Sequence, residues 1–452
     1  MIIQTFFINN LVGSVIALAL MGFMFGFTIS WSSPVMPKIQ NLSSDSPFDR
    51  AITDTEISWM TSLVVLGSCC GCWMFGFLTS TIGRRFSTII LGVPMATSYL
   101  LMAIFRTVPV YYVARFIMGF TLGGGNIVSM TYASEISSQS NRGVISTVAG
   151  TSLAIGTLFC YSIGPWVSVT ELNIILSVFP LITIAICIIF CEESPYYYLV
   201  KGEEDLAKKA LMTFRPPGTD VDKELEEILI KIEEQKSGNF WKIIKSKSVM
   251  KSLFIGNMLL IFQQFTGING ISMYSQSIFD ETGSNLSSAV CSIILGALQL
   301  TSGSIAPIVV DRFNRRSLMI VSASGMILFE VLLGIYCVVD QVSSFFKFVP
   351  ILCLAGFMFS YNFGIGPLCW VVTSEIYAAR IKSMAMAFSV FVYYVVGFVV
   401  TRYFKAVQNA IGIGALFFIF AGCCGLCIAF IIFCVIETKG KTLEQIQDQL
   451  ER

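Results

Sequence analysis

The sequence contains no histidine and few charged residues, since Asp, Glu, Lys and Arg make up only 13% of its 452 residues. Without histidine, the chain lacks the commonest metal ligand and any histidine-based proton relay. Hydrophobic residues account for 55% of the chain and the mean hydropathy is +0.77, which excludes an ordinary soluble globular protein. We therefore expect a membrane protein that crosses the bilayer many times.

Catalytic motifs are missing as well. No pairing of a nucleophile with a base is recognisable, so we do not expect an enzyme, and we predict no cofactor, no metal and no nucleic-acid partner. The 14 cysteines lie in or at the ends of apolar stretches, including the pairs Cys69/Cys70 and Cys423/Cys424. Because they do not recur in outer loops as a disulfide framework would, we interpret them as small buried hydrophobes.

Long apolar stretches are abundant. Crossing ~30 Å of hydrocarbon takes ~20 helical residues, and about twelve stretches qualify. They lie near residues 11–31, 57–79, 86–105, 109–133, 143–165, 171–191, 251–272, 288–310, 317–339, 345–371, 383–404 and 411–435. The first has no basic segment before it and no small-residue cleavage site, so we interpret it as a retained span rather than a signal peptide.

The basic residues predict the orientation. If the N-terminus is cytoplasmic, the loops after even-numbered spans and both tails hold most of the 29 Lys and Arg, as the positive-inside rule requires. The two Asn-x-Ser/Thr sequons, at Asn41 and Asn285, then both fall in outer loops, where they are candidate glycosylation sites. We expect a plasma-membrane protein with both termini in the cytoplasm.

Four segments follow from this pattern. Residues 1–191 form a six-helix half, residues 192–250 a cytoplasmic linker, residues 251–435 a second six-helix half, and residues 436–452 a cytoplasmic tail. In the linker, apolar residues recur at helical spacing among charges, which predicts short amphipathic helices at the membrane surface. The predicted fold class is an all-α membrane protein with these twelve transmembrane helices in two pseudo-symmetric halves.

The two halves repeat each other in sequence. The stretch "GFLTSTIGRR" (76–85) after the second span matches "DRFNRR" (311–316) after the eighth. Likewise, "YASEISSQSNRG" (132–143) after the fourth span matches "VTSEIYAARIKS" (372–383) after the tenth. A duplication with a substrate between the halves is typical of transporters.

Charged residues recur at equivalent loops of both halves. Glu135 precedes Arg142 by the same spacing at which Glu375 precedes Lys382. We expect ion pairs at these helix ends to form when the halves close there and to separate when they open, as a switch requires. Exposed ion pairs contribute only ~0–1 kcal/mol each to stability, so we interpret them as a switch rather than as an anchor. The alternative interpretation is that the basic residues merely anchor the ends of the loops. The other predicted members of this charged cluster are Arg84, Arg85, Glu193, Arg315 and Arg316.

The collective pattern resembles the sugar porters of the major facilitator superfamily, in particular the insect facilitated trehalose transporter-like branch and the glucose transporters. The matching segments are "GFMFGF" (22–27), "GRR" (83–85), "RFIMGFTLGGG" (115–125), "SEISSQSNRG" (134–143), "EESPYYYLVKG" (192–202), "QQFTGINGISMYS" (263–275), "GIGPLCW" (364–370) and "ETKGKTLEQI" (437–446). The resemblance implies the major facilitator fold, and it implies a small sugar and the lipid bilayer as partners. It leaves the oligomeric state open.

Polar side chains interrupt the seventh apolar stretch, "IFQQFTGINGISMYSQSIF" (261–279). Uncharged amides are costly in hydrocarbon unless partners satisfy them. The resemblance implies that Gln263, Gln264 and Asn269 bind sugar hydroxyls and that Tyr274 belongs to an outer gate. The alternative is that the amides only hydrogen-bond a neighbouring helix.

Glycines in the same stretch predict a broken helix. On an unbroken helix Gln264 and Asn269 would not share a face with Gln263, because side chains turn by ~100° per residue. We expect Gly267 and Gly270 to interrupt the helix and turn Asn269 inward.

Two further substrate contacts are implied by the resemblance. "GIGPLCW" (364–370) ends in Trp370, which supplies an apolar face and one N–H donor suited to a pyranose ring. The alternative is that this Trp, near a helix end, is an anchor at the membrane interface. Gln299 in the eighth span stands where relatives carry an Asn. Gly150 stands where many hexose transporters have a binding Gln, and Tyr394 replaces a Trp, so hexose specificity does not transfer directly.

Three functions remain open: a facilitative transporter of a hexose or trehalose, a proton-coupled sugar symporter, and a non-transporting sugar sensor. Coupling requires an ionisable group in the transport path. Proton-coupled relatives carry an Asp where this chain has Thr28, which favours facilitated transport. Glu330 lies within the ninth span and is the exception, but we expect it to face protein or the headgroup region. A sensor would be expected to carry long cytoplasmic extensions.

Overall fold

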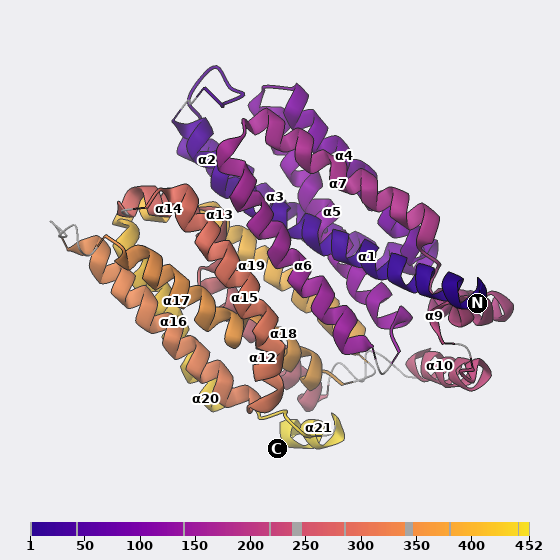
Figure 1. Cartoon of the computed structure of the whole chain (residues 1–452). Helices are drawn as coiled ribbons and strands as arrows, with labels where there is room; N and C mark the ends of the chain where they lie inside the picture. The colour runs from indigo at the N-terminus through magenta and orange to yellow at the C-terminus, as the bar shows by residue number, and fades with distance from the viewer. Residues whose placement is uncertain are drawn as a thin grey trace. The chain divides into compact units, whose positions relative to one another are not determined.

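The computed structural model describes residues 2–41, 44–138, 141–216, 218–236, 246–283, 286–339, 347–378, 381–441 and 443–451, which are almost entirely helical. Figure 1 shows long helices running through the structure. The helices of the first half are α1 (Ile2–Ser30), α2 (Ser32–Gln40), α3 (Asp54–Ile82), α4 (Arg84–Ile104), α5 (Val108–Ile136), α6 (Arg142–Ile163) and α7 (Val169–Phe190), with a short 3-10 turn, η1 (Gly164–Trp166).

Three short helices follow: α8 (Pro195–Lys201), α9 (Glu204–Phe214) and α10 (Val221–Lys236). The segment between α9 and α10 is fastened to the end of α5. Arg215 Nη1 donates a 2.9 Å hydrogen bond to the carbonyl oxygen of Ile136, and Arg215 Nη2 lies 2.7 Å from Glu224 Oε1. A cation at the C-terminus of α5 also complements the dipole of that helix.

The helices of the second half are α12 (Lys247–Phe265), α13 (Ile268–Met273), α14 (Ser275–Thr282), α15 (Ser288–Arg312), α16 (Arg315–Val338), α17 (Val349–Phe363), α18 (Ile365–Ile376), α19 (Lys382–Ile411), α20 (Ile413–Cys434) and α21 (Leu443–Glu451). Two of the predicted spans are broken. One is interrupted between α12 and α13, and the other between α17 and α18, where Gly364 separates the helices.

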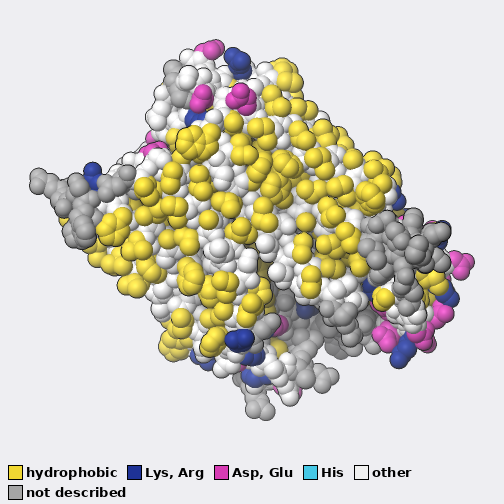
Figure 2. Space-filling model, in the orientation of Figure 1, with side chains coloured by type: hydrophobic (Ala, Val, Ile, Leu, Met, Phe, Trp, Pro, Cys, Tyr) yellow, Lys and Arg dark blue, Asp and Glu magenta, His cyan; other side chains and the backbone are white. Residues whose placement is uncertain are grey.

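Within the described residues, ten helices are long and apolar enough to cross a membrane. The other two predicted spans are α5, which carries the buried Arg115, and α12, whose apolar run ends at Phe265. Large apolar side chains cover the helices on the face drawn in Figure 2, and Phe433 is 85% exposed. An apolar surface of this extent is typical of a protein embedded in a membrane. The prediction of an all-α, twelve-span membrane protein is confirmed.

Small residues set the packing of α3 against α5. A Cβ added at Gly71 would overlap the carbonyl oxygen of Phe120, and one added at Gly123 would overlap the carbonyl oxygen of Ser68. Ser68 Oγ in turn donates a 3.0 Å hydrogen bond to the carbonyl oxygen of Gly119. Without a hydrophobic driving force between helices in lipid, this close backbone approach is what holds the pair together.

The chain divides into two compact units, which cut across the sequence halves. Unit 1 comprises residues 1–28, 66–156 and 170–239. Unit 2 comprises residues 29–65, 157–169 and 240–452. Unit 2 therefore contains short segments of the first half packed against the whole of the second half.

Candidate functional site

The break predicted in the seventh span is present at Gly267. α12 ends at Phe265, and Gly267 has a φ of 77°, a left-handed conformation that favours glycine. A Cβ added there would lie 2.6 Å from the ring of Phe420. The prediction for Gly270 is wrong, because Gly270 lies inside α13, where the ring of Phe404 packs against the space that a side chain would fill.

The break brings two amides together. Asn269 Nδ2 donates a 2.7 Å hydrogen bond to Gln264 Oε1. On a continuous helix these side chains would point ~140° apart. The chain therefore uses the interruption at Gly267 to gather donors and acceptors on one side, as the sequence predicts.

Gln263 connects the seventh span to the broken tenth span. Its Nε2 donates hydrogen bonds of 2.9 Å to the hydroxyl of Tyr361 and 2.9 Å to the carbonyl oxygen of Gly366. These two partners flank Gly364, where α17 gives way to α18. Gln263 therefore contacts both sides of the interruption in the tenth span.

One polar atom of each glutamine has no hydrogen-bond partner in the described structure: Gln263 Oε1, an acceptor, and Gln264 Nε2, a donor. Both side chains are at most 1% exposed. An unmatched buried polar atom costs ~1–3 kcal/mol. A hydroxyl can both donate and accept, so the hydroxyl groups of a bound ligand could satisfy both atoms.

Aromatic side chains adjoin the amides. Trp370 on α18 packs edge-on against Tyr393 of α19, with ring centroids 4.9 Å apart. The hydroxyl of Tyr393 adjoins the amides of Asn269 and Gln264. Trp370, predicted as a ligand contact, is thus joined to the amides through Tyr393. We call Gln263, Gln264, Asn269, Tyr361, Trp370 and Tyr393 the amide cluster.

Tyr361 and Tyr393 were not predicted as site residues. Tyr394, the neighbour of Tyr393, departs from the family pattern in sequence, but the contact to the amides comes from Tyr393, which also packs against Trp370. The sequence feature that could have identified them is a tyrosine hydroxyl within each of two apolar spans. Gln299, on α15, is half-buried, and among the described residues no hydrogen bond or ring contact joins it to the amide cluster.

Tyr274 lies at the junction of α13 and α14. It is 2% exposed, and its ring stacks on Phe404 with centroids 5.0 Å apart and planes at 5°. Its hydroxyl adjoins Ser58 and Thr61 of α3. Tyr274 therefore joins the broken seventh span to a segment of the first half, within unit 2.

Further contacts in unit 2 fasten the start of α3 to the end of α19. Asp54 accepts a 2.8 Å hydrogen bond from Asn409 and a 2.9 Å hydrogen bond from Gln40. The guanidinium of Arg402 lies 4.5 Å from the ring centroid of Trp59. We call Asp54, Trp59, Arg402 and Asn409 the α3–α19 clasp.

The predicted charged cluster of the first half is assembled at the N-terminus of α4. Glu193 Oε1 accepts a 2.7 Å hydrogen bond from the backbone N–H of Arg84, and Oε2 accepts a 3.1 Å hydrogen bond from that of Arg85. Arg84 Nη2 lies 2.8 Å from Glu135 Oε1. Burial raises the pKa of Glu193 above its usual range, although the backbone donors oppose this shift.

The second half repeats this arrangement. Glu437 accepts 3.1 Å hydrogen bonds from the backbone N–H groups of Arg315 and Arg316, and Arg315 Nη2 lies 3.9 Å from Glu375 Oε1. Burial acts to raise the pKa of Glu437, but hydrogen bonds from backbone N–H groups outweigh burial and hold that pKa below its usual value. Neither ion pair joins the two units: Arg84–Glu135 lies within unit 1 and Arg315–Glu375 lies within unit 2.

Glu437 was missed as a member of this cluster. The signal lay in the sequence, because Glu193-Ser194 follows the last span of the first half just as Glu437-Thr438 follows the last span of the second. Thr438 Oγ1 donates a 2.6 Å hydrogen bond to Glu375 Oε2, which completes the repeat.

The remaining predicted residues are less involved. Lys382 and Asn41 are exposed. The side chain of Arg142 and the whole of Asn285 lie outside the described residues. The gating and glycosylation roles of all these positions stay predictions.

The two residues considered for proton coupling are both buried. Thr28 Oγ1 donates a 2.7 Å hydrogen bond to the carbonyl oxygen of Met24 and lies 2.9 Å from the hydroxyl of Tyr99. Glu330 on α16 is 1% exposed and lies beside Cys424 of α20. Glu330 therefore faces protein, as expected, on a helix that contributes nothing to the amide cluster.

Comparisons with known proteins agree with this architecture. The profile of the family described as "Sugar (and other) transporter" matches residues 14–450. The facilitated trehalose transporter Tret1 of Drosophila grimshawi is 30% identical over 433 residues, which cover 94% of this chain and 46% of that protein. Solute carrier family 2, facilitated glucose transporter member 6 of Mus musculus is 30% identical over 453 residues, which cover 95% of this chain and 89% of that protein. This chain thus spans about half the length of the Drosophila relative.

Solved structures show the same fold. The xylose transporter XylE from E. coli in an inward open conformation matches with a TM-score of 0.79 and 22% identity, over 96% of this chain and 98% of that one. The proton:xylose symporter XylE bound to 6-bromo-6-deoxy-D-glucose, of the major facilitator superfamily, matches with a TM-score of 0.78 and 21% identity, over 98% and 99%. The chain is an integral membrane protein with the major facilitator fold, and it belongs to the sugar (and other) transporter family.

Proposed function

We propose that this protein moves a small sugar, a hexose or trehalose, across the membrane by facilitated diffusion with alternating access. The observation that carries the proposal is the pair of unmatched buried atoms, Gln263 Oε1 and Gln264 Nε2, beside the aromatic rings of Trp370 and Tyr393. Uncharged amides together with an aromatic face suit a ligand that is polar through hydroxyl groups and carries no charge.

The relatives support the same substrate class. Two of them are named as facilitated transporters of trehalose and of glucose. The amide cluster provides donors and acceptors but no charged side chain, which suits a neutral sugar better than an organic ion. We infer no enzymatic activity, because the relatives are named as transporters.

Alternating access needs interactions that exist in only one of two global states. We assign this role to Tyr274 and the α3–α19 clasp at one end of the helices, because they join first-half segments to the second half. We assign a supporting role to the charged clusters around Glu193 and Glu437, because each cluster fixes the start of a helix, α4 or α16.

A proton-coupled symporter is the second candidate, favoured only by the likeness to XylE, which establishes the fold alone. Thr28 cannot exchange a proton at physiological pH, and Glu330 lies away from the amide cluster. We further propose a plasma-membrane location with both termini in the cytoplasm. In that orientation the exposed Asn41 faces outward and is open to glycosylation.

Uptake by purified protein in liposomes tests the proposal. Radiolabelled glucose and trehalose are offered separately, with a charged organic ion as a control solute. We expect saturable entry of at least one sugar, which stops when the internal and external concentrations are equal. Uptake of neither sugar above protein-free liposomes would refute sugar transport, and accumulation above the external concentration under a pH gradient would favour the symporter.

A further inference from the structure

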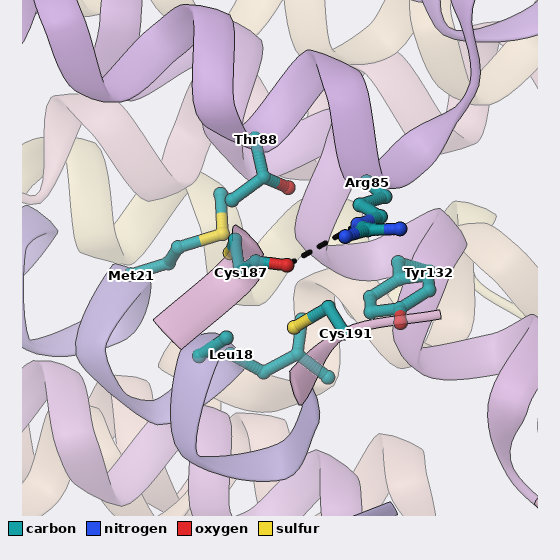
Figure 3. A pocket seen from close by; sticks show the side chains of 8 residues that line it. Leu18, Met21, Arg85, Thr88, Tyr132, Cys187 and Cys191 are labelled. Carbon is teal, nitrogen blue, oxygen red and sulfur yellow. Dashed lines mark hydrogen bonds between the residues drawn. The ribbon is translucent and has the colours of Figure 1, made fainter. Parts of the chain in front are cut away.

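A small cavity lies in unit 1 between α1, α4, α5 and α7, separate from the amide cluster. Its walls include Leu18, Met21, Arg85, Tyr132, Cys187 and Cys191. Figure 3 shows these side chains converging on one space, with the two cysteines contributed by the end of α7. None of the roles assigned above accounts for a pair of thiols in such a place.

The two thiols are placed for bonding to each other. Cys187 lies in the last turn of α7, and Cys191 follows immediately after Phe190, where the helix ends. The two thiols adjoin each other and line the same cavity, and a disulfide requires their Cβ atoms to come within ~3.5–4.5 Å. Because Cys191 lies beyond the helix, its backbone is freer to bring the sulfur atoms together. Both cysteines are free thiols in this structure.

A fixed cation forms part of the same cavity wall. Arg85 Nε donates a 3.2 Å hydrogen bond to the carbonyl oxygen of Cys187, and Nη2 donates a 2.7 Å hydrogen bond to that of Ile188. The first of these is drawn in Figure 3. A nearby guanidinium favours the thiolate, which is the reactive form of cysteine.

Access to the thiols is restricted by size. Cys187 is 1% exposed and Cys191 is 4% exposed, so a bulky thiol reagent cannot reach either. A hydroperoxide such as hydrogen peroxide is close to water in size and can enter a small cavity. The site therefore selects small oxidants.

We propose that Cys187 and Cys191 form a redox-sensitive dithiol that small hydroperoxides convert reversibly to an intramolecular disulfide. The Cys191 thiolate attacks one oxygen of the hydroperoxide. An S–O bond forms, the O–O bond breaks, and the other oxygen leaves as an alcohol, or as water from hydrogen peroxide, after taking a proton. The sulfur is oxidised by two electrons to a sulfenic acid.

Cys187 completes the reaction. Its sulfur attacks the sulfur of Cys191, the S–S bond forms and the S–O bond breaks. The departing hydroxide takes the proton of the Cys187 thiol and leaves as water. The net reaction consumes two thiols and one hydroperoxide. An external dithiol reverses it by thiol–disulfide exchange.

The disulfide would act on the charged cluster of the first half. Cys191 lies two residues before Glu193, which accepts hydrogen bonds from the backbone N–H groups of Arg84 and Arg85. A disulfide between Cys187 and Cys191 would pull on the connecting segment that carries Glu193. It would also pull on the carbonyl oxygen of Cys187, which accepts a hydrogen bond from Arg85. We expect oxidation to slow transport, a consequence that rests on the proposed function, whereas the chemistry at the thiols does not.

Mass spectrometry of the purified full-length protein tests the chemistry. After hydrogen peroxide treatment the protein is unfolded, so that burial no longer shields any thiol, and the remaining thiols are alkylated. Cys187 and Cys191 should then escape alkylation, and the peptide that holds them should lose about 2 Da, the two hydrogens removed as the disulfide forms. Dithiothreitol should restore both alkylation sites. A bulky aromatic disulfide reagent should leave these two thiols unmodified.

Two variants and one control make the result decisive. Cys187→Ala should stop the reaction at the sulfenic acid, a gain of about 16 Da at Cys191, and Cys191→Ala should leave Cys187 reduced. Cys423→Ala, which removes a half-buried thiol on α20, should leave the disulfide unaffected. Full alkylation of both thiols after peroxide, or pairing of either with a different cysteine, would overturn the proposal.

Transport measurements separate this proposal from the proposed function. Peroxide should slow sugar uptake by the wild type, with recovery in dithiothreitol, and should not slow uptake by Cys191→Ala. If the disulfide forms but uptake is unchanged, the regulatory consequence is wrong and the chemistry stands. If no sugar is taken up under any condition, the proposed function fails while the mass result remains valid.

Discussion

Asn269 donates a 2.7 Å hydrogen bond to Gln264 across the break at Gly267. The contact exists because the helix is interrupted, since an intact helix would point the two amides ~140° apart. The arrangement of the ligand-binding groups therefore depends on one backbone conformation, and disturbing that conformation should disturb binding without touching any amide.

Gly267→Ala should lower both the thermal-unfolding midpoint and the sugar affinity. The left-handed conformation costs a residue with a side chain ~1–3 kcal/mol, and the new Cβ would lie 2.6 Å from the ring of Phe420. Gly283→Ala is the matched control, because Gly283 has a φ of 66° and no neighbour within 4 Å of an added Cβ. That control should lose some stability and keep full affinity. Equal effects of the two variants on affinity would contradict the role of the break.

The sequence predicts this break only in part. Gly267 and Gly270 look alike in sequence, and only packing distinguishes the glycine that ends a helix from the one that admits the ring of Phe404. Apolar length predicts spans well, because lipid imposes a fixed thickness. It does not show which hydroxyl of an apolar helix faces an amide, so Tyr361 and Tyr393 emerged only from the structure.

Internal repetition predicted the charged clusters but not all their members. The recurring loop motifs predicted that Arg84, Arg315, Glu135 and Glu375 belong to one charged cluster, without pairing them. In the structure Arg84 pairs with Glu135 and Arg315 with Glu375. The sequence could not show that each pair closes within its own unit, because that depends on which helix ends meet in space.

Acidification should loosen the charged cluster of the first half before that of the second. As the pH falls, Glu193 is protonated first, because its pKa is raised by burial, whereas the pKa of Glu437 is lowered by backbone donors. Protonation removes the charge that strengthens the hydrogen bonds from the backbone N–H groups of Arg84 and Arg85. Hydrogen exchange, corrected for its intrinsic pH dependence, should show these amides losing protection at a higher pH than those of Arg315 and Arg316. The reverse order would refute the assignment.

Arg402→Met should loosen the α3–α19 clasp. It removes a cation–π contact with Trp59 worth ~0.5–2 kcal/mol, while keeping a long apolar side chain. Amides in the first turns of α3 should exchange about 2- to 30-fold faster. Arg50→Met is the control, because Arg50 pairs with Glu56 close to it in the chain and its side chain is 58% exposed. If Arg50→Met accelerates exchange as much as Arg402→Met, the clasp does not link the two helices.

Transport should be independent of protons. Sugar uptake into liposomes with an imposed pH gradient is compared with and without a protonophore, for the wild type and for Glu330→Gln. We expect no accumulation above the external sugar concentration and no difference between the two proteins, because Glu330 is buried against α20 rather than placed at the amide cluster. Accumulation that both the protonophore and Glu330→Gln abolish would make the protein a symporter.

The most direct test of the account compares sugar uptake by Gln263→Leu and Asn257→Leu, two amide replacements on α12. Each residue has a buried side-chain oxygen without a partner, but Gln263 bonds Tyr361 and Gly366 in the amide cluster, whereas Asn257 Nδ2 donates a 2.7 Å hydrogen bond to the carbonyl oxygen of Leu253 in its own helix. We predict that Gln263→Leu folds, as judged by its thermal melt, and binds sugar about 5- to 150-fold more weakly, which corresponds to ~1–3 kcal/mol for one lost polar contact. Asn257→Leu should transport as the wild type does. Unchanged uptake by Gln263→Leu at equal amounts of folded protein would contradict the assignment of the sugar site.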